Sequence, residues 1–122
     1  MEKTENTCIR GCANVDMINR GINQLAMLLP QFNDMSKLFN LLGNDTRLKI
    51  LYLIKNEKDI CVCDLSDILN LSVSAISQQL SKLKNGGILE SKKQGQTIFY
   101  SISKNFDPIL NQYLKVDLNL IK

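Results

Sequence analysis

The feature that most constrains the fold is a change in the spacing of hydrophobic residues at Gly86-Gly87. Before this glycine pair, hydrophobic residues recur every three or four positions, which is typical of helices that pack one face on a core. After it they recur every second position, as at Ile98, Tyr100 and Ile102, which is typical of strands. Gly95-Gln96 can form a turn, so residues 88–94 and 97–103 are predicted to pair as a hairpin.

Two short helices precede the hairpin, separated by a break of three residues. The first is predicted within residues 60–69, after an entry that carries two cysteines, and the second begins after Asn70-Leu-Ser72, where Ser72 can cap it. We expect the first helix to support the second through Leu65, Ile68 and Leu69. Two short helices with a tight break, followed by a hairpin, are the order of a winged helix-turn-helix. The predicted fold class is therefore mainly α, with one hairpin as the wing.

The chain of 122 residues has room for one compact domain and a short arm. Residues 1–14 contain little hydrophobic material and are predicted to be a mobile arm, followed by one winged-helix domain over residues 15–122. Asn44 or Asp45 can cap a helix, and a final amphipathic helix begins near Phe106.

A hydrophobic stripe follows the arm. Its spacing predicts a helix that ends at Pro30, and a second short stripe over residues 35–42 is closed by Gly43. The first stripe and the last helix are candidates for a dimer interface, because their apolar faces exceed what a small core needs. The first stripe consists of Val15, Ile18, Ile22, Leu25 and Leu29.

The second short helix, here called the reading helix, has an outer face of small, hydrogen-bonding and basic side chains without an acid. Glutamine can pair bidentately with adenine, and serine can contact bases or phosphates. Residues 72–104 contain five lysines and one glutamate, a net charge of +4, so the rest of the chain carries −1 of the total +3. This concentration of charge favours DNA binding over a merely solvated face. The candidate DNA-binding residues are Ser72, Ser74, Ala75, Ser77, Gln78, Gln79 and Lys82 on the helix, and Lys92, Lys93 and Gln96 on the wing.

The chain contains four cysteines and no histidine. The lack of histidine excludes Ser-His-Asp and Cys-His catalytic sets and any imidazole zinc site. The cysteines form two tight pairs, Cys8 with Cys12 and Cys61 with Cys63, and neither has the C-x-x-C spacing of a zinc ribbon. An all-sulfur ligand set suits cadmium, lead, bismuth, mercury, trivalent arsenic or zinc. Free thiols and a reversible redox switch between cysteines are the alternatives.

Other classes of protein are disfavoured. The polar start has no secretory signal, and the longest apolar run, residues 25–29, is far shorter than the roughly 20 residues of a membrane span. We therefore expect a cytoplasmic protein without a membrane partner. No acid–base pair, phosphate loop or nucleophile–base set predicts an enzyme. A plain protein-interaction module with solvated lysines is the remaining alternative.

Four segments together resemble the ArsR/SmtB family of metal-sensing repressors: residues 42–51, 60–65, 74–80 and 93–100. The resemblance covers roughly residues 35–103. It implies a homodimeric winged-helix repressor whose metal-free form binds an inverted-repeat operator in double-stranded DNA. It also implies that metal binding releases the operator and derepresses metal resistance or efflux genes.

The arm resembles that of the cadmium- and lead-responsive members, in which an N-terminal cysteine pair joins the Cys-Val-Cys pair of the partner subunit. This resemblance implies Cys8, Cys12, Cys61 and Cys63 as metal ligands, with cadmium or lead as the favoured inducer. Bismuth, mercury, trivalent arsenic and zinc remain open, as does a thiol-redox repressor. Zinc-sensing members use histidine and carboxylates on the last helix. This chain has Asp107 and Asp117 there but no histidine, so a second site is not expected.

Overall fold

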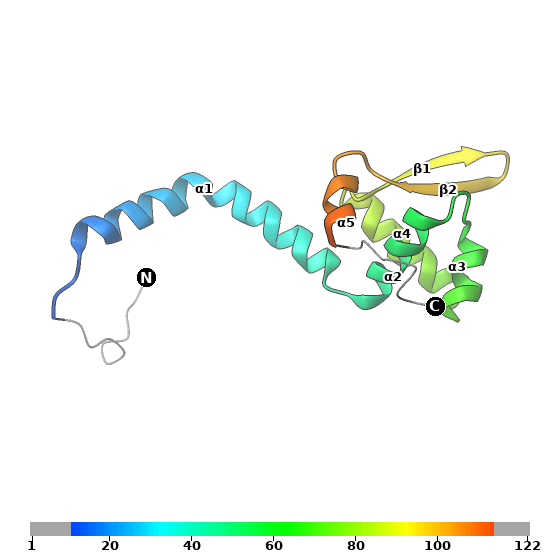
Figure 1. Ribbon diagram of the computed structural model, residues 1–122, viewed down its shortest axis with the longest axis horizontal. Helices are drawn as coiled ribbons and strands as arrows, with labels where there is room; N and C mark the ends of the chain where they lie inside the picture. Colours follow the sequence, from blue (N-terminus) through cyan, green and yellow to red (C-terminus); the bar gives the residue numbers. More distant parts are fainter. Residues whose placement is uncertain (1–10, 114–122) are drawn as a thin grey trace. The chain divides into compact units, whose positions relative to one another are not determined.

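The computed structural model describes residues 11–113. These residues fall into two compact units that divide between Ser36 and Lys37. The elements in chain order are α1 (Val15–Leu42), α2 (Asp45–Asn56), α3 (Val62–Leu69), α4 (Val73–Asn85), β1 (Leu89–Gln94), β2 (Thr97–Ile102) and α5 (Asp107–Tyr113) (Figure 1).

Helix α1 is one continuous helix of 28 residues, and Pro30 lies inside it. The prediction that a helix ends at Pro30 is therefore wrong. Proline removes one intrahelical hydrogen bond and crowds the preceding turn, at a cost of about 3 kcal/mol. Neither a glycine nor a capping residue stands beside Pro30, and its neighbours Leu29 and Gln31 favour helix. The first complete stop signal is Gly43-Asn44, and the helix ends just before it.

The stripe predicted on α1 is exposed in this single chain. Its five hydrophobic residues have exposed fractions between 37% at Ile18 and 60% at Val15. The C-terminal end of α1 belongs to the second unit, where Leu38, Leu41 and Leu42 pack against the core. An apolar stripe of this size is a surface that another polypeptide can cover.

The hydrophobic core lies in the second unit and joins α2, α3, α4 and the wing. Leu65 of α3 is 1% exposed, and Ile76 and Leu80 of α4 are fully buried. Close packing in a protein core transmits displacements between the elements that share it. The buried hydrophobic residues are Ile50, Leu51, Ile54, Ile60, Leu65, Ile76, Leu80, Leu83, Ile88, Leu89, Phe106 and Leu110.

Local polar signals set the helix boundaries around the reading helix, α4. The side chain of Asn44 accepts a hydrogen bond from the backbone N–H of Arg47 at 3.0 Å, which caps α2. Ser72 caps α4 in the same way, through the N–H of Ala75. Asn70 ends α3 in the left-handed conformation, with φ 55°, which asparagine tolerates better than most residues. The predicted break between the two short helices is confirmed.

The wing is a two-stranded antiparallel hairpin, as predicted, and differs from the expected limits by one residue at its outer ends. Gln94 pairs with Thr97, so the connection is the two-residue turn Gly95-Gln96. Gly95 has φ 65°, a conformation that glycine adopts without strain. The register places Lys92 opposite Phe99 and Lys93 opposite Ile98.

Candidate functional site

The reading helix presents most of the predicted DNA-binding residues to solvent. Ser72 and, on α4, Ser74, Ser77, Gln78 and Lys82 are exposed, whereas Ala75 and Gln79 are half-buried. The half-buried pair flanks the face that packs on the core, and Ser74 and Gln78 lie opposite Ile76 and Leu80.

The amide of Gln79 is held by a residue that the sequence did not reveal. Arg47 Nη1 donates a hydrogen bond to Gln79 Oε1 at 2.8 Å, and Arg47 Nε donates to the backbone carbonyl of Leu41. Arg47 thus joins the end of α1 to α4. No pattern in the sequence indicated this contact, because its partners are 32 residues apart.

The wing carries Lys92 and Lys93 on β1 and Gln96 in the turn, all exposed. Successive strand residues point to opposite faces, so the two lysines project from the two sides of the hairpin. Each can therefore approach a different phosphate beside a wing seated on DNA.

Cys61 and Cys63 lie where α3 begins. Cys61 is the residue before the helix and is extended, with φ −107° and ψ 174°, while Cys63 is an exposed residue of the first turn. The two cysteines, two positions apart in the sequence, therefore lie on extended and on helical backbone respectively. Cys12, Cys61 and Cys63 are free thiols, and Cys8 lies outside the described residues.

The carboxylate of Asp64 accepts two hydrogen bonds from Cys61. Its Oδ2 accepts hydrogen bonds from the backbone N–H of Cys61 at 3.1 Å and from the Cys61 thiol at 3.2 Å. These bonds, the backbone one first, hold the pKa of the Asp64 carboxyl below its ordinary value. Asp64 thereby fixes the backbone at the start of α3 and the direction of the Cys61 side chain.

The cysteine pair shares a hollow with the reading helix and the wing. This hollow has a volume of about 360 Å³ and is lined by Cys61 and Cys63, by Ser77 of α4 and by Gln96 of the turn. Its remaining lining residues are Val62, Thr97, Ile98 and Tyr100. The structure therefore brings together two groups predicted separately, the thiols and part of the DNA-binding surface.

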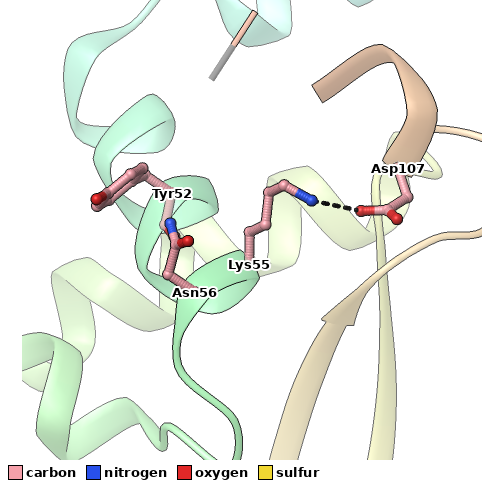
Figure 2. A network of polar contacts seen from close by, with 4 residues as sticks. All are labelled: Tyr52, Lys55, Asn56 and Asp107. Atoms are coloured by element: carbon pink, nitrogen blue, oxygen red, sulfur yellow. Dashed lines mark hydrogen bonds and ion pairs between the residues drawn. The ribbon is translucent and has the colours of Figure 1, made fainter. Parts of the chain in front are cut away.

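Within residues 11–113, no three cysteine or carboxylate side chains come together as a set that could hold a metal ion. The described residues therefore place the two thiols of Cys61 and Cys63 near one another without a third candidate ligand that completes a set with them. On α5, Asp107 forms an ion pair with Lys55 of α2, with 3.2 Å between Asp107 Oδ1 and Lys55 Nζ (Figure 2). Asp107 is thus held by a cation, and Asp117 lies outside the described residues.

Support of the reading helix by α3 differs from the expectation at one residue. Leu65 is buried and Leu69 is half-buried against the core, but Ile68 is 55% exposed. Ile68 therefore does not support α4, because it lies on the outer face of a helix only eight residues long.

In the described part of the chain, no helix has the length and apolar character to cross a membrane.

Comparison with known proteins decides the family. Residues 44–91 match the family described as bacterial regulatory protein, arsR family. The cadmium resistance transcriptional regulatory protein CadC homolog of Staphylococcus aureus is 36% identical over 99 residues, covering 81% of this chain and 80% of that relative. The chain belongs to the ArsR family. It is a winged-helix DNA-binding repressor and not an enzyme.

Solved structures of similar proteins confirm the winged helix-turn-helix prediction for this ArsR-family chain. Reduced HlyU from Vibrio cholerae is 30% identical, with a TM-score of 0.60 over 70% of this chain and 94% of that one. The homodimeric winged helix-turn-helix DNA-binding domain Mb0332 of Mycobacterium bovis has a TM-score of 0.62, and each chain covers 91% of the other. It is 22% identical, so it bears on the fold alone.

Proposed function

We propose that this ArsR-family repressor binds operator DNA as a metal-free homodimer and releases it when a thiophilic metal ion binds its cysteines. Cadmium is a favoured inducer because the relative from Staphylococcus aureus is a cadmium resistance regulator, and lead joins it because the arm resembles that of the cadmium- and lead-responsive members. The operator would be an inverted repeat that controls metal resistance or efflux genes. The observation that carries the proposal is the hollow shared by Cys61, Cys63, Ser77 and Gln96.

The donor set suits such an ion. Cys61 and Cys63 are free thiols, one half-buried and one exposed, at a position where both sulfurs can be reached from solvent. Thiolate ligands select soft ions over magnesium or calcium. Two donors do not complete a site, so we assign Cys8 and Cys12 of the partner subunit's N-terminal segment as the others.

The hollow explains how the cysteines can affect DNA binding. A segment held at Cys61 and Cys63 would occupy space beside Ser77 and Gln96, which are predicted to contact DNA. A shift of α3 would also reach α4 through Leu65, which packs in the same core as Ile76. An affinity change of about 5- to 150-fold corresponds to the usual coupling of about 1–3 kcal/mol between sites.

A second copy of the chain is the proposed partner for α1. The exposed stripe from Val15 to Leu29 has the narrow helical spacing that packs against another helix. Two reading helices on a symmetric dimer would match the two halves of an inverted repeat.

The test uses reduced full-length protein and a DNA duplex selected by the wild type from a randomised pool. Cd(II) is titrated while thiolate-to-metal charge transfer is followed in the ultraviolet and DNA release by fluorescence anisotropy. We expect both signals in the wild type and their loss in Cys61→Ser and Cys63→Ser. Asp67→Asn, which removes a charge from α3 but no sulfur, is the matched control and should behave as wild type. Release of DNA by a cysteine variant on metal addition would refute the assignment.

Mixed dimers test whether the two cysteine pairs come from different subunits. One protomer carries Cys8→Ser with Cys12→Ser, and the other carries Cys61→Ser with Cys63→Ser. Ligation between subunits leaves one complete site in this dimer, whereas ligation within a subunit leaves none. Mass spectrometry after mild peroxide tests the redox alternative: release that requires a Cys–Cys bond and no metal would favour it.

A further inference from the structure

The contact between Arg47 and Gln79 bears on which bases the reading helix can recognise. Arg47 is half-buried on α2, and its guanidinium has partners on two other elements. Nη1 donates to Gln79 Oε1 at 2.8 Å, and Nε donates to the carbonyl oxygen of Leu41 in the last turn of α1. A planar group held at both ends has little freedom to turn away from either partner.

The guanidinium fixes the orientation of the Gln79 amide. Arginine has donors and no acceptor, so the amide atom that faces it must be the oxygen. The amide –NH2 group of Gln79 therefore faces away from Arg47. Gln78, the next residue of α4, is exposed and makes a natural comparison.

This orientation competes with the adenine pairing expected from glutamine in general, because both use Oε1 as the acceptor. A bidentate pair with adenine uses the amide oxygen to accept from N6 and the amide nitrogen to donate to N7. With one lone pair of Oε1 engaged by Arg47, the oxygen is held on the arginine side, and the –NH2 group is the part of the Gln79 amide that is free to turn toward DNA. Donors match the acceptors of guanine, the O4 atom of thymine or a phosphate oxygen.

We propose that Arg47 is a positioning residue that sets the base preference of the reading helix by holding the Gln79 oxygen and so presenting the –NH2 donors of Gln79 in preference to its acceptor. The inference rests on the proposed contact between α4 and operator DNA, and goes beyond it by naming a residue outside the DNA-binding surface. Gln78 keeps both its acceptor and its donors, so the two adjacent glutamines differ in what they can read.

The experiment is selection of duplexes from a fully randomised pool by reduced, metal-free, full-length protein, followed by sequencing. Gln79→Ala identifies the position that Gln79 reads, as the position where preference is lost. Arg47→Met frees the amide, and we expect adenine to gain about tenfold in enrichment at that same position. Arg47→Lys still donates to the amide oxygen and should keep the wild-type preference. Gln78→Ala marks the neighbouring position, which Arg47→Met should leave unchanged.

The double variant Arg47→Met with Gln79→Ala separates positioning from a general effect on folding. If Arg47 acts through Gln79, the double variant selects the same sequences as Gln79→Ala alone. The inference would be overturned, with DNA binding intact, if Arg47→Met kept the wild-type base preference. It would also be overturned if Arg47→Met lost base preference at duplex positions that Gln79→Ala does not affect. Failure of the wild type to enrich any duplex would overturn it together with the proposed DNA contact. Metal response is scored separately, by adding Cd(II) to the selected complexes.

Discussion

Truncation of Leu65 to alanine should weaken the connection between the cysteine pair and the reading helix. Leu65 is 1% exposed on α3 and packs in the core that also holds Ile76 and Leu80 of α4. The substitution removes the equivalent of three methylene groups, about 2.4 kcal/mol at about 0.8 kcal/mol each, before any cavity is counted. With the cavity, we expect a loss of about 3 kcal/mol in the free energy of unfolding.

The stability assay is thermal unfolding followed by circular dichroism. A loss of this size in a domain of this length should lower the Tm by on the order of 15 °C. The matched control is Ile68→Ala on the same helix, where the side chain is 55% exposed and the expected loss is below about 1 kcal/mol. Leu65→Val leaves a smaller cavity and provides a folded variant if the alanine form unfolds too readily.

The functional assay compares DNA affinity with and without Cd(II), measured below the Tm of each variant. Because Cys61 and Cys63 are untouched, Leu65→Ala should still give the thiolate-to-metal charge transfer. The ratio of the DNA affinities without and with Cd(II) should nevertheless fall toward one, because the packing contact between α3 and α4 through Leu65 is lost. A destabilised Leu65→Ala protein that releases DNA as fully as the wild type would refute transmission through this contact.

Three further outcomes follow from the described contacts. Asn44→Ala removes the cap of α2, because the N–H of Arg47 loses its partner at 3.0 Å, and should lower the free energy of unfolding by about 1 kcal/mol in urea titrations. Lys92→Gln should weaken binding evenly across duplex sequences and reduce the slope of log affinity against log salt by about one, because one phosphate is no longer neutralised; a slope equal to that of wild type would show that Lys92 does not reach DNA. The hydrogen bonds from Cys61 lower the pKa of Asp64 in the folded protein. They therefore stabilise the fold at pH values above the ordinary pKa of 3.8, and this stabilisation is lost as the pH falls through the lowered pKa of the folded state. Asp64→Asn should therefore be less stable than wild type near neutrality and converge with it in acid, and a constant difference across the pH range would contradict this.

Local signals in the sequence predicted the elements around the reading helix well. Ser72 and Asn44 cap helices through bonds to residues three positions away, and Gly95 lies in a two-residue turn. Such features depend only on neighbouring residues, so their positions can be read from the chain. Pro30 misled the prediction because proline is a strong breaker, yet the residues beside it offer no alternative to helix.

The candidate site could be predicted only in part, because its organisation depends on distant residues. The cysteine pair and the DNA-binding residues were identified separately, and only the fold places Cys61 and Ser77 in one hollow. Arg47 gave no signal at all, since its role comes from a contact with Gln79 on another helix. Burial likewise separates Leu65 from Ile68, which hydrophobicity alone could not do on so short a helix.

The most direct test of the central claim measures bound Cd(II) and bound DNA in one titration of the reduced full-length protein. Charge transfer should saturate at about one ion per protomer, and DNA should be released over the same range of metal concentration. Cys61→Ser should show neither change. Saturation of the cysteine site while the DNA stays bound would contradict the account.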